Sequence, residues 1–238
     1  MLWAQRENFY TSRLALKKNL KPYGTDAQNI IAIIPMKPLS QGKSRLSQDL
    51  TAEQRADLVL GMLRRVILAI NGANVDTVWV VGGDERVQEL ARSLGPMWLE
   101  ELGTDLNDTL KRAFDLAFEH GKSALFVAGD LPFLKPADIH SMMQASRRQG
   151  NVTLGPARRD GGTNSILVPL GVPLEPELGQ ASFMKHLTQA ARLETSVAIN
   201  SSQGIGFDLD VVDDLETLQH MEPGLLDRLA EEWKSGLI

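Results

Sequence analysis

The sequence predicts an α/β protein of three layers, in which a mostly parallel sheet lies between helices. Three observations predict this fold class. Short apolar runs of strand length alternate with longer segments of helical period. The first run, 29–35, has five consecutive apolar residues, as in a parallel strand covered on both faces. The length of 238 residues suits a single domain, which we expect over 29–238.

The remaining elements follow this alternation. After the first strand, Thr51 and Gln54 form a capping-box pattern that opens a helix ending at Asn71-Gly72. Further strands are predicted at 75–81, 124–128, 152–154, 165–168, 196–198 and 205–210. Further helices are predicted at 84–94, 106–120 and 136–148, around Leu187, and from Asp213 and Pro223 onward. In sheets of this kind, ligands bind at the carboxyl ends of the strands, so the residues that follow each strand carry the functional information.

Composition narrows the classes of function. The chain has no cysteine, which excludes disulfides and thiolate metal sites and favours a cytoplasmic setting. A net charge of −5 argues against a dedicated nucleic-acid binder. No apolar run approaches the roughly 20 residues of a membrane span. Residues 1–28 carry an excess of basic side chains, and we expect an extension without a functional role.

A basic loop follows the first strand. Lys37, Lys43 and Arg45 lie within nine residues, and Gly42 allows the backbone to turn closely. Such a loop can neutralise a triphosphate with ammonium groups and a guanidinium fork. The alternative is an ordinary surface loop that carries lysines. The pattern G-x-x-x-x-G-K-S/T is absent, so the loop is not a P-loop.

Carboxylates follow two of the predicted strands. Asp130 follows 124–128 after one glycine, and Asp208 and Asp210 stand at alternate positions, which places them on one face of a strand. One or two carboxylates, together with substrate phosphates, suffice to hold Mg²⁺. The alternative is that Asp130 lies in a turn and that Asp210 or Asp213 caps the next helix.

Two further loops could bind an anion. In 160–164, glycines precede Thr163 and Asn164 and let backbone amides approach a ligand. In 179–186, Gly179 and Ser182 lead into a helix whose N-terminus could bind an anion. The alternatives are an ordinary Asp-Gly turn for the first loop and simple helix capping by Ser182 for the second.

Taken in order, these motifs resemble one family. They read P-x-K-P-L-x-x-x-K-S-R-L from Pro35, then L-N-x-x-L, D-L-P, G-G-T-N, G-x-x-S-F-x-x-H and D-x-D. The set resembles the 2-phospho-L-lactate guanylyltransferase family of coenzyme F-420 biosynthesis, from about Ile30 to Leu218. One departure is 208–215, where the family usually reads D-I-D-T-P-x-D-L and this chain reads D-L-D-V-V-D-D-L. This difference affects the start of the following helix more than the carboxylates.

The resemblance implies a single Rossmann-like domain of the GT-A nucleotidyltransferase type. It implies an enzyme that joins GMP from GTP to phosphoenolpyruvate, 2-phospho-L-lactate or 3-phospho-D-glycerate, among which we favour phosphoenolpyruvate. By the same resemblance, each group of residues has an expected ligand. The groups are Lys37, Lys43 and Arg45 for catalysis on the GTP phosphates, Asn107 near the nucleotide, Asp130 with Asp208 or Asp210 for Mg²⁺, and Thr163, Asn164, Gly179 and Ser182 for the acid.

The chemistry fits residues of these types. The acceptor is a phosphate monoester with a second pKa of about 6, so its oxygen is a nucleophile at neutral pH without a general base. Catalysis then rests on positioning and on charge neutralisation. One alternative is another transferase of the same fold, although the L-A-G-G loop of such enzymes is replaced here by 35–38. A second alternative is a nucleotide-binding protein without catalytic activity. The sequence leaves open whether the protein forms a homodimer.

Overall fold

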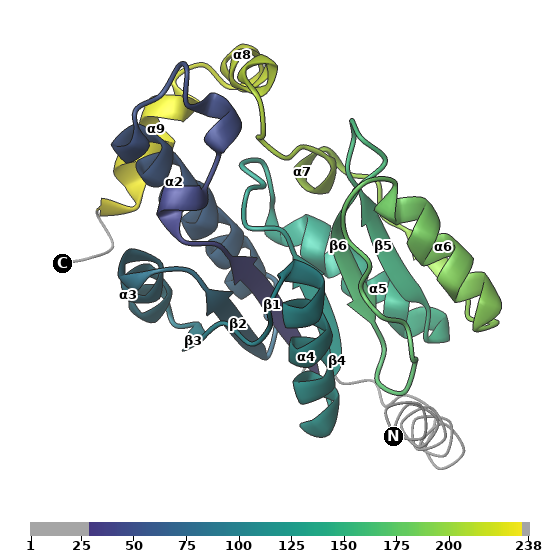
Figure 1. Cartoon of the computed structure of the whole chain (residues 1–238). Helices are drawn as coiled ribbons and strands as arrows, with labels where there is room; N and C mark the ends of the chain where they lie inside the picture. Colours follow the sequence, from purple (N-terminus) through teal and green to yellow (C-terminus); the bar gives the residue numbers. More distant parts are fainter. Residues whose placement is uncertain (1–28, 235–238) are drawn as a thin grey trace.

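The computed structural model describes residues 29–234, so the expectation for residues 1–28 lies outside the described part of the chain (Figure 1). Its strands form a seven-stranded sheet in the order β3-β2-β1-β4-β6-β5-β7. The strands are β1 (Ile30–Met36), β2 (Thr77–Gly82), β3 (Met97–Leu99), β4 (Ser123–Val127), β5 (Val152–Pro156), β6 (Thr163–Val168) and β7 (Val197–Ile199).

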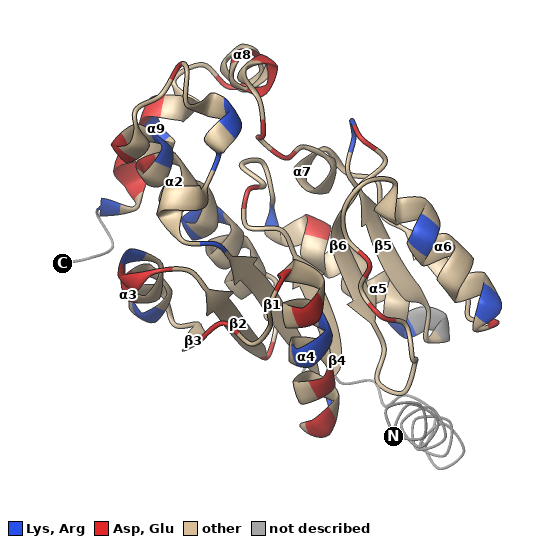
Figure 2. Ribbon diagram, in the orientation of Figure 1, with Lys and Arg blue, Asp and Glu red and all other residues tan. Residues whose placement is uncertain are grey.

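Helices connect most of these strands. They are α2 (Ala52–Gly72), α3 (Glu85–Leu94), α4 (Leu106–Glu119), α5 (Pro136–Gln149), α6 (Ser182–Arg192), α7 (Gln203–Gly206), α8 (Val212–Met221) and α9 (Leu225–Glu232), with short 3-10 helices at Leu39–Gln41 and Ser44–Leu46. The predicted capping box is confirmed, because Thr51 accepts from the backbone of Gln54 and Gln54 accepts from that of Thr51. Within 29–234, no helix has both the length and the apolar character needed to cross a membrane. In Figure 2, acidic and basic residues are interspersed along α3 and α4.

The prediction of a mostly parallel sheet is confirmed. β1 pairs in parallel with β2 and β4, β2 with β3, and β5 with β7. β6 runs antiparallel to both β4 and β5, since only a short loop joins β5 to β6 and a short connection reverses the chain.

Two apolar cores cover the two faces of the sheet. Alternate residues of β1 point to opposite faces, so Ile34 joins the core beneath α2 while Ile33 joins the core beneath α4. Both side chains are fully buried, which confirms the interpretation of the first apolar run. The rigid central strands thus hold the loops at their carboxyl ends in fixed positions.

The prediction of a strand at 205–210 is wrong. Residues 203–206 form α7 instead, because Ser202 accepts a hydrogen bond from the backbone of Ile205 and so caps a helix. The chain is extended after Phe207, with Leu209 donating one backbone hydrogen bond to the carbonyl of Asp130 at 3.3 Å. The expected alternation of buried and exposed side chains is still present in this segment. Phe207 and Leu209 are buried, whereas Asp208 and Asp210 are partly exposed.

Candidate active site

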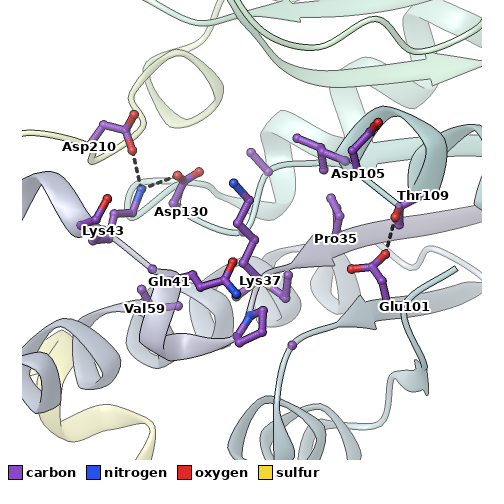
Figure 3. Close-up of a pocket in the computed structure, with 18 of the residues that line it drawn as sticks. Pro35, Lys37, Gln41, Lys43, Val59, Glu101, Asp105, Thr109, Asp130 and Asp210 are labelled. Carbon is purple, nitrogen blue, oxygen red and sulfur yellow. Dashed lines mark hydrogen bonds and ion pairs between the residues drawn. The ribbon is translucent and has the colours of Figure 1, made fainter. Parts of the chain in front are cut away.

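A cleft of about 670 Å³ opens at the carboxyl ends of β1 and β4 (Figure 3). Its volume lies in the range of small-molecule and cofactor sites. Pro35 lines it within the end of β1, Lys37 and Lys43 line it after that strand, and Asp130 lines it after β4. The cleft therefore lies at the sheet edge where strand-end residues were expected to meet a ligand.

One end of the cleft holds a cluster of opposite charges. The ammonium group of Lys43 donates to Oδ2 of Asp130 at 2.5 Å and to Oδ1 of Asp210 at 2.9 Å. Arg45 donates to Oδ2 of Asp210 at 3.3 Å. The Lys43 side chain is only 7% exposed, so its charge is shielded from water. The structure thus brings together four residues that the sequence placed in three separate motifs.

Electrostatics keeps this cluster charged. Burial opposes the charged form of Lys43, yet Asp130 and then Asp210 outweigh burial and raise the pKa of its ammonium group. Burial likewise opposes ionisation of Asp210, but Lys43 foremost lowers the pKa of its carboxyl group. Lys43 also adopts a left-handed backbone with φ of 48°, which is costly for a residue with a side chain. The ion pairs help to hold that conformation.

Asp208 is the third carboxylate of this region. Burial raises the pKa of Asp208, and the charges of Asp130 and Asp210 add to the rise. The amide of Asn164 donates to Oδ1 of Asp208 at 3.2 Å and to the carbonyl of Ile205 at 2.9 Å. Asn164 is buried and uses its amide hydrogens for these contacts, so it positions Asp208. This contact links β6 to Asp208, and both Asn164 and Asp208 lie outside the lining of the cleft.

The residues present fit a divalent cation bound mainly by substrate. Within 29–234, no group of three or more His, Asp or Glu side chains converges as a complete metal site. Asp130 and Asp210 nevertheless already share one cation, the ammonium of Lys43. Two carboxylates with waters and phosphates are a donor set suited to Mg²⁺.

A buried polar network lies behind the other predicted loops. Ser182 donates to Oγ1 of Thr163 at 3.1 Å, and Nδ1 of His186 lies 3.1 Å from the same oxygen. The backbone of Glu177 donates to Nε2 of His186 at 2.9 Å, so the ring proton is on Nδ1 and is donated to Thr163. Burial first, and then Lys185, lowers the pKa of His186 to about 4. The imidazole is therefore neutral.

The interpretation of Ser182 as a helix cap is wrong. Ala181 occupies the N-cap position of α6 with a left-handed φ of 53°, and Ser182 is the first helical residue. Its hydroxyl turns inward to Thr163 rather than to the backbone of the helix. Gly179 has a φ of 114°, a conformation that favours glycine. Thr163, Gly179 and Ser182 lie outside the lining of the cleft.

The remaining two predicted site residues, Lys37 and Asn107, lie in different surroundings from each other. Lys37 lines the cleft, and no carboxylate within the described residues pairs with it. Asn107 donates to the carbonyl of Leu178 at 3.2 Å and accepts from its backbone N–H at 2.7 Å. Its neighbours Asp105 and Leu106 line the cleft, while its own amide fastens the loop before α6 to the start of α4.

Sequence reasoning missed the far end of the cleft, which Gly83, Glu101, Thr104, Asp105 and Thr109 help to line. Glu101 follows β3, and a strand of three residues is too short to give a periodic signal. Asp105 could have been found, because an aspartate directly before a helical pattern is a common N-cap.

Comparison with known proteins gives consistent matches. The chain matches the family described as "Guanylyl transferase CofC like" over residues 30–224. It is 35% identical over 192 residues to the phosphoenolpyruvate guanylyltransferase of Rubrobacter xylanophilus, covering 80% of this chain and 94% of that protein. It is 32% identical over 197 residues to the 2-phospho-L-lactate guanylyltransferase of Methanothermobacter thermautotrophicus, covering 80% and 85%.

Solved structures support the fold. A structure from Desulfovibrio desulfuricans G20, assigned to the nucleotide-diphospho-sugar transferases, superposes with a TM-score of 0.70 at 17% identity, covering 86% of this chain and 97% of that one. A nucleotidyl transferase from Methanothermobacter gives a TM-score of 0.56 at 14% identity, covering 81% and 97%. At these identities the likeness shows a shared nucleotidyltransferase fold and nothing finer.

Proposed function

The chain belongs to the CofC-like guanylyltransferase family, and we propose that it joins GMP, taken from GTP, to a phosphorylated three-carbon acid. Pyrophosphate is the second product, and the reaction serves coenzyme F-420 biosynthesis. The observation that carries this proposal is the cluster in which Lys43 lies between Asp130 and Asp210 at one end of a nucleotide-sized cleft.

Phosphoenolpyruvate is the acid that we favour. Relatives named phosphoenolpyruvate guanylyltransferase reach 35% identity, against 32% for one named after 2-phospho-L-lactate. The three acids differ by few atoms, so a modest change in one polar contact can shift the preference among them.

The reaction needs charge neutralisation more than proton transfer. A phosphate oxygen of the acid attacks the α-phosphorus of GTP, a new P–O bond forms, and the bond to the β-phosphate breaks with departure of pyrophosphate. Lys37, Lys43 and Arg45 are placed to offset the phosphate charges, which are largest in the transition state. Mg²⁺ held by Asp130 with Asp210 would add Lewis-acid stabilisation when bound. Asp208, held by Asn164, would contribute negative charge beside that pair.

The acid belongs on the β6 side of the carboxylates. Asn164 connects Asp208 to β6, and the adjacent residue Thr163 begins the network with Ser182 and His186. Gly179 and Ala181 have left-handed backbones in the loop that faces this network. A phosphate or carboxylate bound there by Thr163 and Gly179, with Ser182 orienting Thr163, would lie next to the cluster proposed to hold GTP.

No feature of the described residues favours either alternative function, namely another nucleotidyltransferase of this fold or a nucleotide-binding protein without activity. A molybdenum-cofactor or sugar-phosphate transferase would carry a glycine-rich loop where this chain has Pro35 and Pro38. A protein without activity would have no need to keep Asp130 and Asp210 converged on one cation. A cytoplasmic setting and a homodimer stay predictions.

A pyrophosphate-release assay tests the proposed function. The full chain is incubated with Mg²⁺, GTP or ATP, and each of the three acids in turn. We expect release only when GTP and an acid are both present, with phosphoenolpyruvate turned over fastest. Release that is independent of the acid would indicate a GTP hydrolase, and equal turnover of ATP would refute guanine preference.

A further inference from the structure

A single carboxylate stands at the end of the cleft opposite the charged cluster. Glu101 follows the edge strand β3, and Figure 3 shows it on the other side of Lys37 from Lys43, Asp130 and Asp210. Since the cations gather near Asp130, the phosphates of a nucleotide belong there. The base then extends toward Glu101 in a cleft whose lining includes the apolar side chains of Pro35 and Leu106.

The Glu101 side chain is exposed, and neighbouring residues restrain its carboxylate. The buried hydroxyl of Thr109, in the first turn of α4, donates a hydrogen bond to its Oε1. Its Oε2 lies against Gly82, where a β-carbon would be only 2.8 Å from that oxygen. The following loop packs closely on α4, since a β-carbon at Gly103 would lie 2.4 Å from the backbone nitrogen of Thr109. A carboxylate restrained in this way can select a ligand by hydrogen-bond geometry.

Glu101 also has unused capacity to accept hydrogen bonds. Within 29–234, no lysine or arginine pairs with it, and Thr109 is the side chain that donates to it. The nearby carboxylate of Asp105 is partly committed, because its Oδ1 accepts from the backbones of Asn107 and Asp108 as the N-cap of α4. A carboxylate has about four lone-pair sites, so Glu101 can still accept two further donors.

We infer that Glu101 reads the Watson–Crick edge of guanine and so sets the preference for GTP. Guanine presents two donors on that edge, N1–H and the N2 amino group, which match the two oxygens of a carboxylate. Adenine presents the lone pair of N1 at the same place, which a carboxylate repels. This inference rests on the proposed function, in that GTP is taken as the donor nucleotide.

The test uses Glu101→Gln, a change that keeps the shape and the hydrogen bond from Thr109 but turns one acceptor into a donor. The matched control is Glu100→Gln, because Glu100 is exposed, adjacent and outside the cleft lining. Binding of GTP, ITP and XTP to the full chain is measured by calorimetry, and kcat/KM is measured for each with phosphoenolpyruvate. ITP lacks the N2 amino group, and XTP has an acceptor oxygen in its place.

In the wild type and in Glu100→Gln, we expect GTP to bind roughly 10- to 100-fold more tightly than ITP or XTP, the range of a hydrogen bond to a charged group. In Glu101→Gln, GTP should lose most of this advantage. XTP should bind more tightly than it does to the wild type, because the new amide can donate to its oxygen.

Two results would overturn the inference. Unchanged discrimination in Glu101→Gln would place the base elsewhere. Equal weakening of all three nucleotides would show that Glu101 contacts the ribose or only supports the fold. The binding measurement stands even if no acid is guanylylated, so failure of the proposed function and failure of this inference are distinguishable.

Discussion

The ammonium group of Lys43 lies 2.5 Å from the carboxylate of Asp130, although 87 residues separate them in the chain. Lys43 simultaneously contacts Asp210, so one side-chain cation neutralises two carboxylates in a nearly buried position. A divalent cation bound by the same carboxylates has to share or displace this ammonium. We propose that the lysine keeps the carboxylates together without metal and would offset phosphate charge once substrate is bound.

Replacing Asp130 by asparagine should lower kcat by roughly 100-fold or more, the scale observed when one preorganised electrostatic group is removed. Asparagine keeps the shape but loses the charge that would attract Mg²⁺ in the proposed site. Steady-state kinetics across a Mg²⁺ titration is the measurement, with Asp213→Asn as the control because Asp213 is exposed. A kcat near that of the wild type at ordinary Mg²⁺ would reduce Asp130 to a turn residue.

Replacing Lys43 by glutamine should separate its two roles. Without Mg²⁺, the variant should lose about 1–2 kcal/mol of stability, since Asp130 and Asp210 then repel each other in a partly buried site. Mg²⁺ should raise its Tm more than it raises that of the wild type, while kcat falls. Thermal melting with and without Mg²⁺ checks this, and Lys37→Gln is the matched control. An identical response to Mg²⁺ in both variants would contradict the account.

Stability should depend on pH through His186, whose pKa is lowered to about 4 from 6.5 by burial first and by Lys185 second. Between these values the unfolded chain binds more protons than the folded one, so stability is lost as pH falls from 6.5 toward 4. The loss between pH 7 and pH 5 should be about 2 kcal/mol. Urea unfolding of the wild type and His186→Gln measures it, with exposed His220→Gln as the control. A loss of the same size in His186→Gln would refute this assignment.

Replacing Ser182 by alanine should raise the KM for the acid roughly 5- to 10-fold and leave the KM for GTP nearly unchanged. The reason is that Ser182 orients Thr163, which we place at the acid, and a neutral hydrogen bond contributes about 1 kcal/mol. Exposed Ser201→Ala is the control. If stability falls while both KM values stay constant, the hydroxyl only supports the fold.

Much of the site could be predicted from the sequence, because ligands bind at the carboxyl ends of the strands in sheets of this kind. A buried apolar run followed by a charged residue places that residue at the ligand-binding edge, and this pattern indicates Lys37 and Asp130, which both line the cleft. The alternation of Asp208 and Asp210 also held, although the strand did not form. Extended backbone alone gives a period of two, whether or not a neighbouring strand pairs with it.

Other features depend on contacts that no local pattern encodes. Glu101 is fixed by Thr109 and Gly82, which come from different elements, and its own strand is too short to recognise. Ser182 stands where a serine usually caps a helix, but the left-handed Ala181 shifts the cap by one residue. The serine hydroxyl then meets Thr163 across the fold, a contact visible only in three dimensions.

The central claim is that the acid's own phosphate oxygen attacks the α-phosphorus of GTP, and isotope labelling tests it most directly. Phosphoenolpyruvate carrying ¹⁸O in its phosphate is incubated with GTP, Mg²⁺ and the full chain, and the products are examined by ³¹P NMR and mass spectrometry. The account predicts two coupled phosphorus signals from a P–O–P linkage, with ¹⁸O in the bridging position and none in pyrophosphate. Unlabelled GMP as the main product, or label in pyrophosphate, would contradict it.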